Sequence, residues 1–192
     1  MTTKTTARAS RPSAANYSID QHKHRYAAWA ACRGASVIGC RFSVQQGRQL
    51  LEACGFEATL SQPHQLPNEN VIDQQHQRWR VGMIKAARYR GLSMTHGVAA
   101  KLINLYLKCR FVCGGHHDHP RVRQLHPPID SVMLKALVKF DVGGFQPQWR
   151  QLQNQRWSKF SSTQYQLAIS LVRQSLGGEP LWQIEQYWQG NQ

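Results

Sequence analysis

The chain has 192 residues, a formal net charge of +14 and a pI near 10.1. This length accommodates one substantial buried core, either as one domain or as two closely packed helical lobes. The positive charge favours a polyanionic partner, and no apolar run is long enough to span a membrane.

The amino-terminal segment and the cysteine content predict a cytoplasmic protein with a basic tail. Five cysteines, an odd number with no signal peptide ahead of them, favour reduced thiols. Residues 1–16 are basic, rich in Ser and Thr and free of acidic residues, which predicts a disordered tail that touches phosphates. The same composition weakly imitates an organellar transit peptide. Residues 17–192 are expected to form a single, monomeric helical domain.

Two helices are predicted at the start of this domain. Ser18 and Gln21 form a capping box, and the residues that follow have helical spacing, which predicts a helix over residues 19–35. A second capping box, at Ser43 and Gln46, begins a helix that ends at Gly55. Both are interpreted as packing elements.

The central part of the chain is strongly basic. Residues 63–70 are polar and rich in turn formers, and residues 71–90 predict a long helix. No acidic residue lies between Gln74 and His117. Eight cations do lie there: Arg78, Arg80, Lys85, Arg88, Arg90, Lys101, Lys108 and Arg110. They form either a solvated basic face or the electrostatic footprint of a nucleic-acid-binding surface.

Two helix starts stand out in the stretch from residue 91 to residue 137. Glycines and hydroxyl residues precede an apolar helical pattern that begins near Gly97, so a turn should lead into a helix there. Such a start exposes unpaired amides and a positive dipole end, which suit a phosphate. Lys101 lies one turn into this helix. Two prolines place Asp130 at another helix start, and the two side chains are expected to converge.

The carboxy-terminal part reads as three further helices. The sequence VGGFQP interrupts the chain before a short helix over residues 149–160. A third capping box, at Ser161 and Gln164, begins a helix through Leu176, and a last helix follows Pro180. Because neither strands nor repeats are evident, the fold class is expected to be all-α.

Two segments carry a family resemblance. GVAAKLIN, residues 97–104, resembles the second half of the helix-hairpin-helix motif of the HhH-GPD DNA glycosylases, the superfamily of 8-oxoguanine DNA glycosylase and endonuclease III. PPIDSVML, residues 127–134, resembles the Pro/Val-Asp segment of the same family. The resemblance implies that Asp130 is the catalytic aspartate and that Lys101 is the lysine of the bifunctional members.

The resemblance also implies an architecture. It predicts a two-lobed helical bundle, with residues 17–65 and 145–192 in a packing lobe and residues 66–144 in the helix-hairpin-helix lobe. The chain departs from the family at Ala99, which replaces the second glycine of the hairpin. It also carries an insertion, CGGHHDHPRVRQLH, and lacks any cysteine after Cys113, so no iron–sulfur cluster is predicted.

The remaining site residues are assigned by type. The amides of Gly97, Val98 and Ala99 and the cations Arg88, Arg90 and Lys108 are predicted to contact DNA phosphates. A pocket for a flipped base needs aromatic or histidine walls, and the residues favoured for it are Trp29, Phe145, Trp149, His116 and His117. Trp79 and Trp157 are also available.

The Cys/His-rich insertion contains enough ligands for a zinc ion. The candidate set is Cys109, Cys113, His116 and His119. Their order is not a standard zinc signature, and buried cysteines beside a histidine-lined loop explain the pattern equally well. No cofactor is therefore expected, with zinc kept as the weaker alternative.

These assignments predict a glycosylase that acts on double-stranded DNA in the cytoplasm, at the nucleoid. Asp130 would stabilise the cationic sugar, and Lys101 would attack C1′ and form a Schiff base, which permits AP-lyase cleavage. An oxidised base, an alkylated base and a bulky modified base of a viral genome all remain open as substrates, so the role is DNA repair or antiviral defence. The alternatives are a non-catalytic helix-hairpin-helix DNA-binding protein and a zinc-dependent nuclease.

Overall fold

The computed structural model describes residues 17–56 and 60–190, so the tail predicted over residues 1–16 lies outside the described residues. Within them the regular elements are helices, and the one strand-like feature is an isolated bridge between Val37 and Cys40. The predicted all-α class is therefore confirmed. None of the described helices is both long and apolar enough to cross a membrane.

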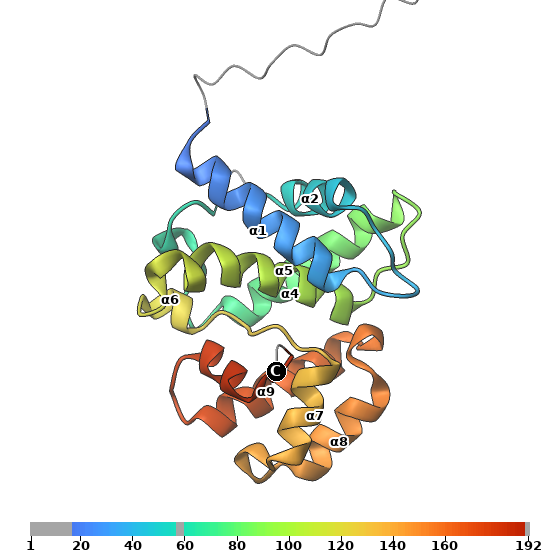
Figure 1. The fold of residues 1–192 in the computed structure, drawn as a ribbon, viewed down its shortest axis with the longest axis vertical. Helices are drawn as coiled ribbons and strands as arrows, with labels where there is room; N and C mark the ends of the chain where they lie inside the picture. The colour runs from blue at the N-terminus through green and yellow to red at the C-terminus, as the bar shows by residue number, and fades with distance from the viewer. Residues whose placement is uncertain (1–16, 57–59, 191–192) are drawn as a thin grey trace, which may run out of the picture.

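The helices follow one another along the whole described chain (Figure 1). The α-helices are α1 (Ile19–Ala35), α2 (Val44–Ala53), α4 (Ile72–Arg88), α5 (His96–Leu107), α6 (Pro120–Arg123), α7 (Ser131–Lys139), α8 (Gln146–Gln155) and α9 (Ser162–Leu176). The 3-10 segments are η2 (Pro63–Gln65), η4 (Val142–Gly144), η5 (Trp157–Lys159) and η6 (Leu181–Tyr187), and η3 (Lys108–His116) is π-helical.

Three helices begin where the sequence predicts a capping box. In each, a serine hydroxyl accepts a hydrogen bond from the amide of a glutamine three residues later, and the glutamine side chain accepts one from the serine amide. The pairs are Ser18 with Gln21, Ser43 with Gln46 and Ser161 with Gln164. These predicted helix starts are confirmed, because the side chains satisfy amides that a helix start leaves unpaired.

Helix α5 lies at the centre of the molecule. Ten of its 12 residues are buried, and α1, α4, α9 and η5 all pack against it. Figure 1 shows α1, α2, α4 and α5 together in the upper part of the view, and α7, α8 and α9 in the lower part. The segment after α6 runs between these two groups and leads to Asp130 at the start of α7.

The packing of α1 differs from the expected lobe of residues 17–65 with 145–192. Helix α1 packs against α5, α2 and η3 rather than against the carboxy-terminal helices. Small side chains are the physical reason, since they let two helix backbones approach closely. Four alanines of α1 are fully buried: Ala27, Ala28, Ala31 and Ala35.

The single helix predicted over residues 149–160 is divided. Helix α8 begins earlier, at Gln146, because Pro147 suits the first turn of a helix, and it ends at Gln155. Arg156 then has a φ of 60°, which stops the helix before η5. This break matters for the site, because it turns Trp157 back toward α5.

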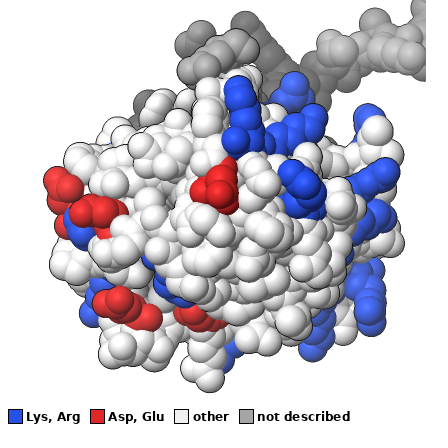
Figure 2. Space-filling model, turned by 90° about the horizontal axis from the view of Figure 1, so that it is seen from below, with Lys and Arg blue, Asp and Glu red and all other residues white. Residues whose placement is uncertain are grey.

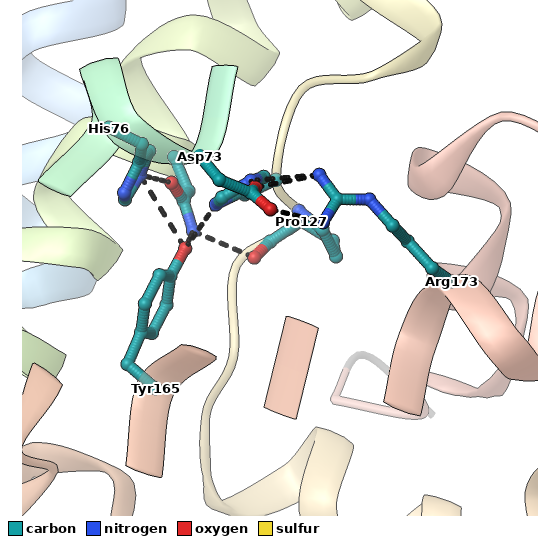
Figure 3. Close-up of polar contacts among 7 residues, drawn as sticks. Asp73, His76, Pro127, Tyr165 and Arg173 are labelled. Atoms are coloured by element: carbon teal, nitrogen blue, oxygen red, sulfur yellow. Dashed lines mark hydrogen bonds and ion pairs between the residues drawn. The ribbon is translucent and has the colours of Figure 1, made fainter. Parts of the chain in front are cut away.

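A buried polar network holds the segment before Asp130 in place (Figure 3). Asn104 of α5 donates to the carbonyl oxygen of Pro127 at 2.8 Å and to the Tyr165 hydroxyl at 2.9 Å. His76 of α4 donates from Nε2 to Asn104 Oδ1 at 2.8 Å. These bonds tie residues 124–130, the linking segment between α6 and α7, to three helices. The backbone that carries Asp130 is therefore fixed close to α5.

Asp73 anchors the same segment from the other side. Its carboxylate accepts a hydrogen bond from His126 Nε2 at 2.8 Å and two from Arg173, at 2.6 and 2.7 Å. His126 Nδ1 lies 3.0 Å from the Tyr165 hydroxyl, so a neutral ring accepts there while Nε2 donates to Asp73. Helices α4 and α9 are thereby joined through His126 (Figure 3).

Candidate active site

Lys101 and Asp130 are in direct contact beside a pocket. Lys101 lies in the second turn of α5 and is only 8% exposed. Its Nζ lies 2.9 Å from Asp130 Oδ2 and 4.6 Å from the ring centre of Trp157. The two charged residues are 29 positions apart in the sequence. The fold therefore brings together the two side chains that the sequence singled out.

Asp130 acts both as a helix cap and as the partner of Lys101. Its Oδ1 accepts the Met133 amide at 2.8 Å, which caps α7, and its Oδ2 accepts from the Trp188 indole at 3.2 Å. Burial raises the pKa of the Asp130 carboxyl, but the Lys101 ammonium and these hydrogen bonds outweigh burial and lower the pKa overall. A carboxylate is thus the stable form of Asp130.

The pocket beside this pair has a volume of about 230 Å³. Its charged and aromatic lining residues are Lys101, Lys108, Asp130, Glu185 and Trp188, and its remaining walls come from Ala30, Gly34, Leu105 and Pro128. Residues from α1, α5, the linking segment and the carboxy terminus therefore meet there. A small ligand inside would contact two ion pairs at once.

Sequence reasoning missed Glu185 and Trp188, which complete this pocket. Lys108 and Glu185 form an ion pair through Nζ and Oε2. Burial raises the pKa of Glu185, Lys108 lowers it and Asp130 raises it, and the net direction is upward. One signal was available in the sequence: acidic residues number only ten in the chain, so each partly buried one is a candidate for function.

The amides predicted to bind a phosphate are engaged within the protein. The Gly97 amide donates to the Phe160 carbonyl at 3.3 Å, and the Val98 amide donates to Thr95 Oγ1 at 3.2 Å. The Ala99 amide donates to the Thr95 carbonyl at 3.0 Å. Thr95 caps α5 as an N-cap residue. The prediction of free donors at this helix start is therefore wrong.

Gly97 has a packing role instead. A Cβ atom at this position would lie 1.8 Å from the carbonyl oxygen of Trp157, a distance that no side chain tolerates. The absence of a side chain lets the backbone of η5 lie directly on α5. This close approach places the Trp157 ring beside Lys101.

A large basic groove is lined by the residues just before and just after Trp157 in the chain, Arg156 and Ser158. Its volume is about 820 Å³, and it is lined by Arg41, Arg156 and Lys159 together with two serines. Ile38, which is 86% exposed, also lines it. Figure 2 shows Lys and Arg gathered along one side of the face in view, with Asp and Glu lying elsewhere on it. The groove suits a polyanion.

The cations of the predicted basic surface lie in different environments. Arg88 and Arg90, at the end of α4 and just beyond it, are exposed, whereas Lys108 is paired with Glu185 in the pocket. Arg80 is fully buried, with its guanidinium carbon 4.3 Å from the ring centre of Tyr165. Arg80 therefore belongs to the core and contributes no surface charge.

The five side chains favoured for the base pocket do not line the pocket beside Lys101. Trp149 is fully buried and donates its indole N–H to the Val142 carbonyl at 2.9 Å, so it is a core residue. Trp29 is 50% exposed on α1, and Phe145 packs against the core. His116 and His117 lie beside other aromatic rings, those of Phe111 and Trp182. The aromatic residues at the Lys101–Asp130 pair are Trp157, which the sequence also offered as a candidate, and Trp188.

The Cys/His insertion does not assemble the alternative zinc set. It forms the π-helical η3, the short α6 and the turn between them. Over residues 17–56 and 60–190, no three His, Cys, Asp or Glu side chains lie close enough together to hold a metal ion. His119 caps α6 through Nδ1, which accepts the Arg121 amide at 3.2 Å.

The chain was compared with known protein families, curated proteins and solved structures. Neither family models, nor curated proteins, nor solved structures give a match to the chain.

Proposed function

We propose that this protein is a DNA glycosylase of the HhH-GPD type, in which Lys101 and Asp130 act on the sugar of a nucleotide flipped out of the duplex. The observation that carries the proposal is the 2.9 Å contact between these two residues beside a pocket of about 230 Å³. Both residues also occupy the positions that the family motifs assign to catalysis.

The chemistry follows from the two groups. Asp130, held as a carboxylate, stabilises positive charge as it develops on the sugar. Lys101 first passes a proton of its ammonium to solvent. As the bond from C1′ to the base breaks, its electron pair leaves with the base, and the free amine of Lys101 forms a new bond to C1′. The nitrogen then loses a proton, and the C1′–O4′ bond breaks as O4′ takes up a proton, which opens the sugar ring and gives a protonated imine. β-Elimination from the imine then cleaves the strand.

The surface supports DNA as the substrate. The groove with Arg41, Arg156 and Lys159 is lined by the chain neighbours of Trp157, whose ring faces Lys101. A backbone held in this groove would present a flipped nucleotide to Lys101. In this proposal the amino-terminal helices α1, α2, α4 and α5 and the carboxy-terminal helices α7, α8 and α9 are the two lobes that enclose the site.

Borohydride trapping tests the proposal without knowledge of the substrate base. A duplex that contains one abasic site exposes C1′ directly, and reduction of the imine should join the parent protein to this DNA irreversibly. Lys101→Ala and Lys101→Arg should both abolish the adduct, because neither side chain forms an imine with C1′. Lys135→Ala, on the exposed face of α7, should trap like the parent.

Two results would overturn the assignment. Trapping by Lys101→Ala at the parent level would show that another amine attacks C1′. DNA binding by the parent with no trapping at all would favour the non-catalytic DNA-binding alternative.

A further inference from the structure

The Lys108–Glu185 pair lies in the same pocket as Lys101 and Asp130, and the proposed chemistry gives it no role. Lys101 and Lys108 are seven residues apart, which places them on the same face of the helical segment, two turns from each other. At 1.5 Å per residue this separation is about 10 Å along the axis. Both lysines line the pocket of about 230 Å³, so a base whose C1′ faces Lys101 would lie toward Lys108 and Glu185.

Building on the proposed function, we infer that Glu185 is the general acid that protonates the departing base and that the substrate base is a neutral heterocycle. The Oε proton of Glu185 passes to a ring nitrogen or carbonyl oxygen of the base as the C1′–N bond breaks. The electron pair of that bond stays on the base, which leaves as a neutral molecule. Glu185 is left as a carboxylate and regains its proton from solvent.

The surroundings of Glu185 fit this role. Its side chain is 17% exposed, and burial raises its pKa, so the protonated form is reached more readily than in water. Lys108 faces it directly, and Lys101, Asp130 and Cys109 are the other titratable groups near it. Lys108 stabilises the carboxylate that proton transfer produces. It is therefore a positioning residue, which holds Glu185 and favours its ionised product.

The charges of the pocket favour a neutral base. A cationic, N-alkylated base leaves without protonation, so it needs no general acid. It would also lie against the ammonium of Lys108, whose charge is no longer balanced once Glu185 is protonated. An oxidised purine or a modified pyrimidine is neutral and leaves slowly unless a proton is supplied.

Three kinds of duplex and one conservative variant test this inference. The duplexes carry a panel of neutral modified bases (8-oxoguanine, uracil and 5-hydroxymethylcytosine), the cationic base 7-methylguanine, or an abasic site. Glu185→Gln keeps the shape of the side chain but cannot donate this proton. It should slow release of a neutral base by roughly 100-fold, the usual contribution of a general acid, and leave abasic-site trapping within about 2-fold of the parent. Glu179→Gln, an exposed substitution of the same kind nearby, is the matched control.

The pH profile separates proton donation from a structural role. The rate at which the parent releases a neutral base should fall as pH rises through the pKa of Glu185. This falling limb of the pH–rate profile should be missing in Glu185→Gln. Lys108→Gln removes the cation that lowers this pKa, so the limb should move to higher pH. Trapping on the abasic duplex, which has no departing base, is the reference profile.

Several outcomes would overturn the inference. An equal loss on base-containing and abasic duplexes would give Glu185 a purely structural role, and parent-like release by Glu185→Gln would remove it from the chemistry. Trapping of the abasic duplex by a parent that releases only 7-methylguanine, or none of the neutral bases, would refute the neutral-base substrate. Failure of the proposed function looks different, since the parent would then not trap the abasic duplex.

Discussion

Asp73 and Asp130 are both aspartates at the start of a helix, and both pair with a cation from a distant part of the chain. Both oxygens of Asp73 are occupied by Arg173, and Oδ1 also accepts from His126. Asp130 instead shares one oxygen with a primary amine at the wall of a pocket. The pKa of each carboxyl is lowered, so charge pairing alone does not distinguish them. The two aspartates differ in the cation that each one faces. Asp73 faces a guanidinium held by two hydrogen bonds, whereas Asp130 faces an amine that can become a nucleophile.

The comparison teaches which polar clusters are structural. The Asp73 cluster connects α4, α9 and the linking segment, with His126 neutral between Asp73 and Tyr165 and with both oxygens of Asp73 engaged. A buried network of this kind fixes one arrangement of the core. The Lys101–Asp130 pair has space beside it, and that space is what allows a substrate to replace one of its contacts.

Replacing each aspartate by asparagine should separate the structural role of Asp73 from the proposed catalytic role of Asp130 most clearly. Asp130→Asn keeps a good helix cap but removes the negative charge, so base release should fall by roughly 100-fold or more with little loss of stability. Asp73→Asn should leave the rate per folded molecule at the parent level. Single-turnover release assays, normalised to the folded fraction from circular dichroism, measure both. Parent-like release by Asp130→Asn would remove the basis for calling this pair catalytic.

Gly97 lies one turn before Lys101 in α5 and tests how the backbone supports the site. Gly97→Ala places a methyl group against the Trp157 carbonyl, so α5 and η5 must separate, at a cost of about 3 kcal/mol in the free energy of unfolding. Urea unfolding measures this loss. Gly82→Ala is the control, because the nearest atom to a Cβ there lies 3.9 Å away, an ordinary contact. Equal stabilities for the two variants would show that η5 does not depend on this close approach.

Asp73→Asn should destabilise the protein by a smaller amount. The substitution weakens hydrogen bonds from Arg173 and leaves His126 facing an amide, while the side chain of Asp73 is 40% exposed and partly screened by water. We expect a loss of about 2 kcal/mol in the free energy of unfolding. Glu69→Gln, an exposed acidic substitution just before α4, should change stability little. A loss below the error of the urea titration would mean that the network does not tie α4 to α9.

The buried histidines predict a pH dependence of stability in mild acid. Burial lowers the pKa of His76 and of His126 below the ordinary 6.5, so the unfolded chain binds protons more readily than the folded one. The free energy of unfolding should therefore fall as pH drops below 6.5, by up to about 1.4 kcal/mol per pH unit for each histidine. His76→Gln keeps a donor toward Asn104 and should reduce this slope, whereas His64→Asn on the exposed surface should not. A parent whose stability is flat between pH 4.5 and 6.5 would contradict this reading.

The sequence predicts elements better than it predicts the site's surroundings. Capping boxes and helical spacing are local, so the starts of α1, α2 and α9 could be read directly. The Lys101–Asp130 contact was also predicted, because both residues lie at or near helix starts that the sequence indicates. The burial of Trp149 and Arg80 was not, since aromatic and basic residues occur both in cores and at surfaces, and only packing decides between them. Glu185 lies in a 3-10 segment without any motif, and only the fold brings it to the pocket.

The smallest expected effects concern the basic groove, where each cation contributes little by itself. Arg41→Ala, Arg156→Ala and Lys159→Ala each remove one charge from the groove, so each should lower the slope of log affinity against log salt by about one. Binding should weaken alike for all sequences, because phosphate contacts carry no sequence information.

The matched control for the groove is Lys135→Ala, which removes an exposed charge on α7 from outside its lining. Affinity should be measured on an unmodified duplex over a range of salt concentrations, and trapping should be measured at saturating abasic DNA. Trapping at saturation should stay at the parent level in all four variants, because none of them contacts Lys101 or Asp130. An equal change of salt slope in Lys135→Ala would mean that DNA responds to the net charge of the protein, and the groove would then have no special part in binding.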